Sequence, residues 1–412
     1  MNLNIVKDKK LFSWALYDWA NSAYATIVLA GFYPIIFAEN FASTIPDTER
    51  TLILGISNSS ASLLLIILAP LIGLLADRKR AKKKFLITFA FVGILSTFFL
   101  STVGKDHWLL ASFFFSLSLF GFMLSNVFYD SMILNFGNTK KYDSISAIGY
   151  ALGYLGGGLA FVLSLLFFYY YDQSSSSLIS EKKIVFVFAS FWWLLFMIPL
   201  ILFWKEAPND SKISSRKQYN LRDTYNHIIA NKKLLIFLFS YWIYIDGVDT
   251  IIRMAVNYGI TIGFASSDLL IALLVIQFVG FPATLFIGYL ANKYTTVIGI
   301  QICLVVYLLV TLLSYNLTSI YEFYFIAVLI GLVQGGIQSL SRSYYAKIVP
   351  NERSSEFFGV YNMLGKFAAL IGPLVVGFTS YAFDSTRLGI LSLSLFFIVG
   401  LYLFNIQAKI KK

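Results

Sequence analysis

Two polar side chains that could handle a charge lie inside a long apolar segment near the start of the chain. Asp18 and Asn21 are three residues apart, so they would share one face of a helix, with Tyr17 and Tyr24 close by. An ionisable group inside a membrane-spanning helix is expensive and usually marks a functional site. We therefore expect these four side chains to face a protein interior or a water-filled path, where they could bind a polar solute.

A second acidic cluster lies in an apolar segment of the second half. Asp246 is about 18 Å along its predicted helix, which is near the middle of a bilayer. Asp249 shares its face, and Arg253 follows Asp249 at the spacing of an acid–base pair. Two acids and one base leave one carboxylate to carry a proton or to bind a cationic group. The alternative is a purely structural ion-pair cluster, closed by Lys366 or Arg342.

Further polar side chains occur in apolar segments that would line the same path. Asp130 and Arg342 lie near the predicted inner ends of their segments, where water and long side chains lower the cost of a charge. For these two residues, contact with a substrate and a role in an inner gate both stay open. The remaining candidates for substrate contact are Asn126, Gln334, Gln338 and Lys366, and Tyr129 lies beside Asn126 and Asp130.

The composition is that of a membrane protein with many spans. Of 412 residues, 58% are hydrophobic and only 13% are charged, whereas soluble proteins carry about 25% charged residues. The apolar runs are continuous rather than alternating, which excludes a β-barrel and leaves helices. The one cysteine, Cys303, excludes an intrachain disulfide and a thiolate metal site. No nucleophile or phosphate-binding motif occurs, so we expect neither an enzyme nor a cofactor or metal.

Twelve apolar runs recur along the chain, each long enough to cross a bilayer. Most Lys and Arg residues fall in the loops that are inside if the N-terminus is inside, so both termini are predicted to be cytoplasmic. This asymmetry also explains the net charge of +11 without a nucleic-acid partner. The predicted spans are Leu11–Phe37, Leu52–Leu75, Phe85–Val103, Trp108–Phe136, Ile145–Tyr170, Ile184–Trp204, Leu234–Gly259, Leu269–Leu290, Val297–Tyr315, Phe323–Ile348, Phe357–Tyr381 and Leu388–Ile406.

A short motif at the end of the second span is repeated in the second half of the chain. The motif Gly73-x-x-x-Asp77-Arg78 resembles the loop between spans 2 and 3 of the major facilitator superfamily, and Gly288 begins a degenerate copy with Asn292 in place of the acid. Asp77 and Arg78 are therefore predicted to belong to an inner gate, with an ordinary basic loop as the alternative. The repeat predicts two pseudo-symmetric six-helix bundles, residues 1–204 and 234–412, joined by a cytoplasmic linker, residues 205–233.

Three longer motifs resemble one specific family. They are YDWANSAY in span 1, DGVDTIIRMAVNYG in span 7, and GGIQSLSRSYYAKIVP followed by EFFGVYN at spans 10 and 11. They resemble the autophagy-related-twenty-two-like group, also called the unknown major facilitator family, over all twelve spans. This resemblance implies the major facilitator fold and secondary transport. Fungal vacuolar members of the family are associated with amino-acid efflux.

We expect a secondary active transporter that moves a small polar solute by alternating access. The first candidate is export of an amino acid or a related amine-bearing metabolite, by antiport with protons if transport is coupled. The alternatives are a proton-driven exporter of drugs or other metabolites, a non-transporting receptor or scaffold with the same fold, and a lipid translocator. The expected partners are the small-molecule substrate, the lipid bilayer and protons. We expect a monomer in the inner (plasma) membrane of a bacterium.

Overall fold

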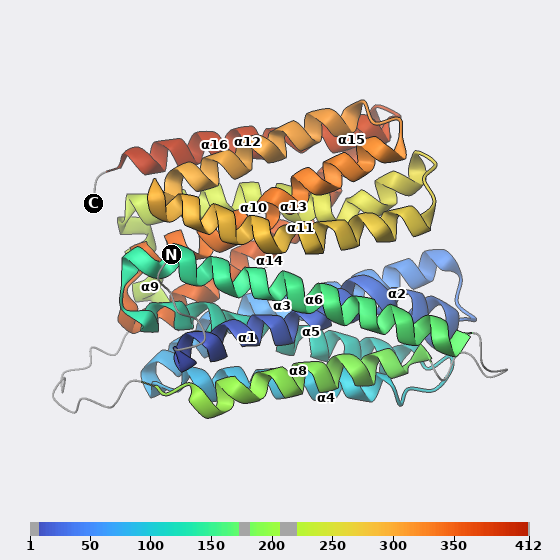
Figure 1. Cartoon of the computed structure of the whole chain (residues 1–412), viewed down its shortest axis with the longest axis horizontal. Helices are drawn as coiled ribbons and strands as arrows, with labels where there is room; N and C mark the ends of the chain where they lie inside the picture. The colour runs from blue at the N-terminus through green and yellow to red at the C-terminus, as the bar shows by residue number, and fades with distance from the viewer. Residues whose placement is uncertain (1–7, 173–181, 207–220, 411–412) are drawn as a thin grey trace. The chain divides into compact units, whose positions relative to one another are not determined.

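The structure is a computed structural model that describes residues 8–172, 182–206 and 221–410. Within these ranges all regular secondary structure is helical (Figure 1). In the described part of the chain, 12 helical segments are long and apolar enough to cross a membrane, and each contains most of one predicted span. The prediction of an all-α protein with twelve spans is confirmed. The segments are Lys9–Phe41, Ile53–Lys79, Lys82–Leu100, Trp108–Phe136, Thr139–Phe167, Ile184–Phe203, Lys232–Ala255, Ile271–Lys293, Thr296–Tyr315, Ile320–Ile348, Asn351–Ala382 and Thr386–Lys409.

The α-helices shown in Figure 1 have bounds that mostly lie within two to four residues of the predicted spans. One of them, α9, is a short helix that precedes the seventh span. The bounds are α1 (Lys9–Ala23), α2 (Tyr33–Ile36), α3 (Asp47–Lys79), α4 (Lys82–Leu100), α5 (Trp108–Ser131), α6 (Tyr142–Asp172), α8 (Ile184–Phe203), α9 (Leu221–Ala230), α10 (Lys232–Thr261), α11 (Ser266–Lys293), α12 (Thr296–Tyr315), α13 (Ile320–Ile348), α14 (Ser354–Ala382), α15 (Thr386–Ser392) and α16 (Ser394–Lys409).

Polar side chains begin several of these helices by accepting bonds from the first backbone N–H groups, which have no partner within the helix. The Asp8 carboxylate accepts from the N–H groups of Lys10 and Leu11 at the start of α1. Asn231 does the same for α10. At the start of α13, Ser319 and Glu322 form a reciprocal capping box. The polar loops between the apolar runs therefore fix where the spans begin.

The first span is not a regular α-helix throughout. After α1 the chain is π-helical over Tyr24–Phe32 and again over Phe37–Phe41, with α2 between them. Pro34 lies at the start of α2, and proline cannot donate the backbone bond that continues a regular helix. π-helical turns often occur at functional sites. Here the first π-helical stretch directly follows the segment that carries Asp18 and Asn21.

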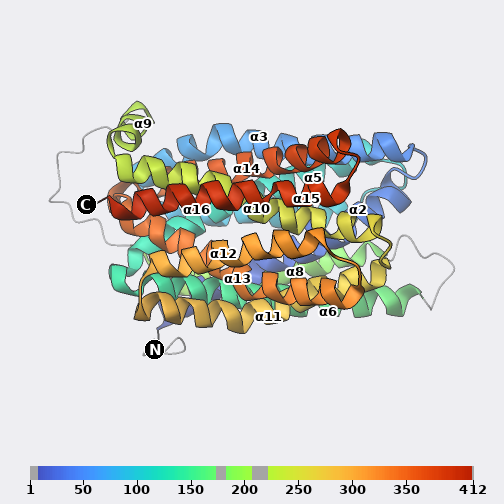
Figure 2. The ribbon, with the colours of Figure 1, turned by 90° about the horizontal axis from the view of Figure 1, so that it is seen from above.

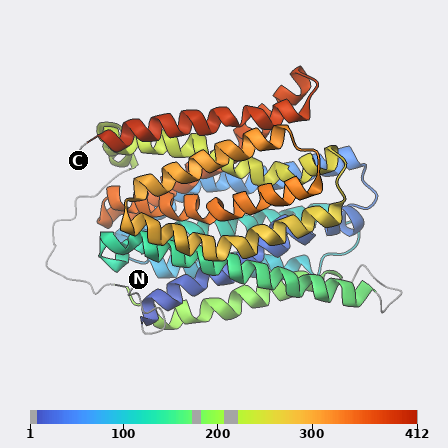
Figure 3. The same cartoon turned by 45° about the horizontal axis from the view of Figure 1, so that its top comes forward.

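The described residues pack into two compact units. The first takes its residues from Met1–Ala69, Leu75–Met132 and Leu152–Ala207, and the second from Pro70–Leu74, Ile133–Ala151 and Pro208–Lys412. Within the first unit, α1 packs on α8 and α4 packs on α5. Within the second unit, α11 and α13 lie side by side, and α10 packs on α14 and α16 (Figures 2 and 3).

The predicted division of the chain at a linker stays a prediction. Of the predicted linker 205–233, residues 207–220 lie outside the described residues, and its end forms α9. The structure adds that the first part of α6 belongs to the second unit, although most of that helix belongs to the first.

Glycines allow α4 and α5 to pack closely. A Cβ atom on Gly121 of α5 would lie 2.5 Å from the backbone nitrogen of Gly93 and 2.7 Å from the carbonyl oxygen of Phe89, both in α4. Small residues at helix contacts serve this purpose in membranes. In contrast, a Cβ atom on Gly55 of α3 would meet nothing within 4 Å.

These surroundings predict opposite effects for the same substitution at two helical glycines. Gly121→Ala forces α4 and α5 apart and should destabilise the protein by about 1–3 kcal/mol, the usual cost of overpacking. Gly55→Ala should be neutral or stabilise by up to about 1 kcal/mol, because alanine favours a helix more than glycine does. The thermal unfolding midpoint of the purified protein in detergent measures both effects. Equal midpoints for the two variants would contradict the predicted packing.

Candidate functional site

The first unit brings predicted polar side chains of spans 1 and 4 into contact. Asp18 is half-buried and accepts a hydrogen bond from the Tyr129 hydroxyl, with 3.1 Å between the oxygens. Asn21 is buried, and its Nδ2 atom donates to Oδ1 of Asn126 at 2.6 Å. Asp130 is also buried and lies one residue beyond Tyr129. The cluster gives a carboxylate and two amides on facing helices.

An aromatic contact positions the Tyr129 hydroxyl. The indole of Trp14 stacks on the Tyr129 ring with 4.5 Å between centroids, and its Nε1 donates to the Tyr129 carbonyl at 3.0 Å. Tyr17 is fully buried, and its ring lies 5.3 Å from that of Tyr129. Tyr24 is also fully buried, with its hydroxyl 2.8 Å from that of Ser118. Both tyrosines predicted to accompany Asp18 therefore lie inside the first unit.

A helix with small residues lies against the same face of α1. A Cβ atom on Gly153 of α6 would lie 2.8 Å from the Ser22 hydroxyl and 3.3 Å from the Asp18 carboxyl carbon. A Cβ atom on Gly156 would lie 2.6 Å from the indole ring of Trp19. Glycine at these two positions is therefore what allows the two helices to approach around Asp18.

In the second unit, Asp246 of α10 is buried and paired with backbone rather than with a cation. Its side chain is 2% exposed, and it accepts from the backbone N–H of Gly372 in α14 at 2.8 Å and from the Thr250 hydroxyl at 3.4 Å. A Cβ atom on Gly372 would lie 2.6 Å from the same carboxylate oxygen. Sequence reasoning missed Gly372 and Thr250. The available signal is the glycine itself, which directly precedes Pro373 within the predicted span Phe357–Tyr381.

Asp249 and Arg253 have the spacing of an ion pair, but the structure does not join them. Asp249 is half-buried and Arg253 is exposed. Neither forms a hydrogen bond or an ion pair with another side chain among the described residues. The Asp249 carboxylate therefore keeps its acceptor positions for another group.

Tyrosines and amides lie on the helices that pack around α10. The Tyr241 ring of α10 stacks on Tyr361 of α14, with 4.1 Å between centroids. A Cβ atom on Gly365 would lie 3.2 Å from the Tyr241 hydroxyl, and half-buried Lys366 follows it. The Oε1 atom of Gln334 in α13 is buried and accepts no hydrogen bond within residues 8–172, 182–206 and 221–410. Gln338, one turn further on, is half-buried.

The start of α6 carries an acidic residue that sequence reasoning missed. Asp143 is 3% exposed and accepts from Nζ of Lys347 at 2.7 Å, from the Thr296 hydroxyl at 2.9 Å and from the Ser343 hydroxyl at 2.5 Å. These donors come from α12 and α13 within the second unit. Asp143 lies two residues before the predicted fifth span, which begins at Ile145, and therefore looks like an ordinary loop residue in the sequence.

Arg342 of α13 is bound to the next turn of α6. Its side chain is 1% exposed, and it donates to the hydroxyl of Ser146 at 2.8 Å and to the carbonyl of Ser146 at 3.0 Å. The guanidinium carbon also lies 4.2 Å from the centroid of the Tyr150 ring, which is a cation–π contact. Arg342 and Asp143 together bond the first three turns of α6 to α13.

Both copies of the repeated glycine lie against the start of a helix. A Cβ atom on Gly73 would lie 2.5 Å from the Ser355 carbonyl oxygen at the start of α14. Gly288 lies against Ala147 in the second turn of α6. Asp77 lies 3.6 Å from Lys82, an ion pair between the end of α3 and the start of α4, and Arg78 is exposed.

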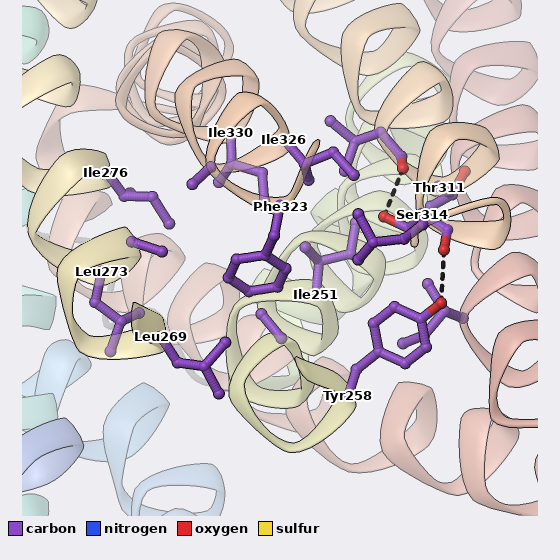
Figure 4. Close-up of a pocket in the computed structure, with 16 residues that line it drawn as sticks. Ile251, Tyr258, Leu269, Leu273, Ile276, Thr311, Ser314, Phe323, Ile326 and Ile330 are labelled. Atoms are coloured by element: carbon purple, nitrogen blue, oxygen red, sulfur yellow. Dashed lines mark hydrogen bonds between the residues drawn. The ribbon is translucent and has the colours of Figure 1, made fainter. Parts of the chain in front are cut away.

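The second unit also contains an apolar cavity of about 40 Å³ between α10, α11, α12, α13 and α15 (Figure 4). Ile251 and Tyr258 of α10 line it, and the Tyr258 hydroxyl donates to the Ser314 carbonyl at 2.6 Å. None of the predicted site residues is among the lining residues. The polar candidates therefore lie outside this cavity.

Comparisons with known proteins agree with this geometry. The family described as "Vacuole effluxer Atg22 like" matches residues 7–411. The "Uncharacterized MFS-type transporter YxiO" of Bacillus subtilis is 36% identical over 94% of this chain and 92% of its own length. "Autophagy-related protein 22" of Kluyveromyces lactis is 23% identical over 79% of this chain and 72% of its own length.

The fold is that of solved major facilitator transporters. The transporter FucP in its outward conformation superposes with a TM-score of 0.75 at 13% identity, over 98% of this chain and 100% of the other. A bacterial homologue of the iron transporter ferroportin in an outward-facing state gives 0.70 at 13% identity, over 99% of this chain and 100% of the other. This family and fold are those of transporters rather than enzymes, as expected from the sequence. The chain belongs to the Atg22-like family of major facilitator superfamily transporters.

Proposed function

We propose that this transporter exports a small polar solute that carries an amino group, with an amino acid as the first candidate. The observation that carries the proposal is the division of roles between the two carboxylates of α10. Asp246 is held by a backbone N–H and a hydroxyl, whereas Asp249 is half-buried and has no partner among the described residues. A carboxylate left without a counter-ion at this depth is suited to an ammonium group.

Other polar and aromatic groups of the second unit complement such a substrate. An ammonium group donates up to three hydrogen bonds, so it needs acceptors besides one carboxylate. The buried Oε1 atom of Gln334 is such an acceptor, and the stacked rings of Tyr241 and Tyr361 offer aromatic surface that favours a cation. We assign Lys366 and Gln338 to the carboxylate end of the substrate, because both can donate hydrogen bonds.

The first unit contains a separate set of candidate residues. We assign substrate contact to Asp18, Asn21 and Asn126. Asp18 is hydrogen-bonded to Tyr129, and Asn21 is hydrogen-bonded to Asn126. We also assign substrate contact to Tyr17, Tyr24 and Asp130. Arg253 is assigned an electrostatic effect on the two acids of α10. Proton coupling through Asp246 or Asp249 would draw on the membrane potential, which is worth about 2.3 kcal/mol per charge at 100 mV.

The bonds at the start of α6 suit a gate. Asp143 and Arg342 hold α6 against α12 and α13 in the second unit, and Gly73 lies against the start of α14. In alternating access such contacts form in one state and break in the other. We assign them, with Asp77 and Arg78, to an inner gate.

The orientation and surroundings are part of the proposal. The concentration of Lys and Arg in alternate loops places both termini in the cytoplasm. The similarity to a Bacillus subtilis protein supports a bacterial plasma membrane. We retain the two bundles, residues 1–204 and 234–412, the linker between them, and a monomeric transporter as working assignments.

Asp246→Asn and Asp249→Asn test the central assignment. Each should abolish or uncouple transport and leave the protein folded, because each removes one charge and keeps the size of the side chain. Uptake of a panel of amino acids into proteoliposomes, with and without a pH gradient, measures the effect. The matched control is Asp384→Asn, at an exposed residue with φ of 49°, a conformation that asparagine tolerates. Gradient-driven uptake that stays normal in both α10 variants would refute the assignment.

Asp143→Asn and Lys347→Gln test the bond between α6 and α13. Each single change should destabilise the protein, and the double variant should be more stable than the sum of the two changes predicts. The expected coupling energy is about 1–3 kcal/mol, as is usual for residues in contact. Chemical unfolding in detergent of the wild type, both single variants and the double variant measures it. Strictly additive effects would show that the contact carries no stability.

Asp77→Ala tests the gate at the end of α3. A cysteine at Ser339 is a suitable reporter, because that side chain is fully buried and its hydroxyl donates to the carbonyl of Gly336 in the same helix. The native Cys303 is also fully buried and should stay silent. Asp77→Ala should increase the rate at which a water-soluble maleimide labels Ser339→Cys several-fold. Identical labelling rates with and without the Asp77 change would count against the gate.

A further inference from the structure

The short helix α9 lies beside the start of a membrane span. It ends at Ala230, and α10 begins at Lys232, so Asn231 alone separates the two helices (Figure 2). The Asn231 side chain accepts from the N–H of Leu234 and so fixes the start of α10. Because α10 crosses the membrane from this point, α9 must lie at a membrane surface.

One face of α9 is bonded to the protein. Thr224 is fully buried, and its hydroxyl contacts both the carboxylate of Glu356 and the guanidinium of Arg353. Glu356 lies in the first turn of α14, and it forms an ion pair at 3.0 Å with Arg353, the residue directly before that helix. The His227 ring also meets Phe357 edge-on, with 5.6 Å between centroids. This face therefore holds α9 on the start of α14.

A second face of α9 is apolar and uncovered by the described part of the chain. Tyr225 is 43% exposed and Ile229 is 66% exposed. They are four residues apart and so lie in one stripe. Each directly follows a buried residue, Thr224 or Ile228, so this stripe is turned by about 100° from the protein-bonded face.

A third face of α9 is polar. Asp223 and Asn226 are exposed, and they are turned by about 140° and about 80° from the middle of the stripe formed by Tyr225 and Ile229. A protein-bonded face, an apolar stripe beside it and polar side chains beyond that stripe are the arrangement of a helix that lies in a membrane interface. The lipid-facing surface of α10 continues from the same place, since Phe239 is 51% exposed two turns into that helix.

We propose that α9 is an interfacial helix whose Tyr225 and Ile229 side chains insert into the phospholipid bilayer at its headgroup boundary. Arg222, exposed beside this stripe, and Lys232 at the start of α10 then face the phosphate groups of the lipids. Because Thr224 of the same helix is bonded to Glu356 and Arg353, the lipid surface holds the start of α14 through α9. This inference rests on membrane insertion of the chain and not on the identity of the substrate.

The depth of spin labels on two faces of α9 tests the insertion. The full-length protein carrying Ile229→Cys, or Asn226→Cys as the matched control, is labelled and reconstituted in vesicles of phosphatidylethanolamine and phosphatidylglycerol. The native Cys303 is buried and does not compete for the label. At residue 229, collisions with oxygen should exceed collisions with a water-soluble nickel chelate several-fold, and at residue 226 the order should reverse. Equal exposure of both sites to the nickel chelate would overturn the proposal.

The link to α14 is tested by changing Thr224 beneath the same label. Thr224→Val keeps the shape of the side chain and removes the hydroxyl, so the label at residue 229 should become several-fold more mobile. Thr224→Ser keeps the hydroxyl and should leave the mobility unchanged. A Thr224→Val variant with unchanged mobility would refute the link. Neither readout depends on transport, so these outcomes are separate from failure of the proposed substrate.

Discussion

Burying charge inside a membrane protein requires donors from the protein itself, and this requirement organises much of the structure. Asp246 obtains a backbone N–H from a facing helix and a hydroxyl from its own, and Asp143 obtains an ammonium group and two hydroxyls. An unpaired carboxylate in either place would cost several kcal/mol. Asp249, which lacks such donors among the described residues, stands out for this reason.

Glycines make these arrangements geometrically accessible. Only a residue without Cβ brings its backbone N–H within bonding distance of the Asp246 carboxylate, and Gly372 does so. Gly153 plays a similar part beside Asp18, where a side chain would collide with the polar face of α1. Gly73 and Gly288, which the sequence marks as a repeat, each lie against the start of another helix. The places where acidic side chains are buried in this chain are therefore also places where glycines let helices pack closely.

The sequence predicts the spans well because each depends on a local property, the length of an apolar run. It also predicts that Asp18, Asn21 and Asn126 belong together, since each is a polar residue in such a run. It does not predict the bonds of Asp143, because the partners lie far along the chain and the residue itself precedes its span. The spacing of Asp249 and Arg253 permits an ion pair, but spacing alone does not orient side chains, and the structure leaves the two apart.

The apolar cavity beside α10 has a mechanical consequence. Ile251 and Ala255 border it, so this part of α10 lacks dispersion contacts that the segment around Asp246 and Gly372 retains. Moving this part of the helix therefore costs less packing energy than moving the segment that holds Asp246. Hydrostatic pressure favours states with less internal void, so compression would first drive the surrounding helices together at this place.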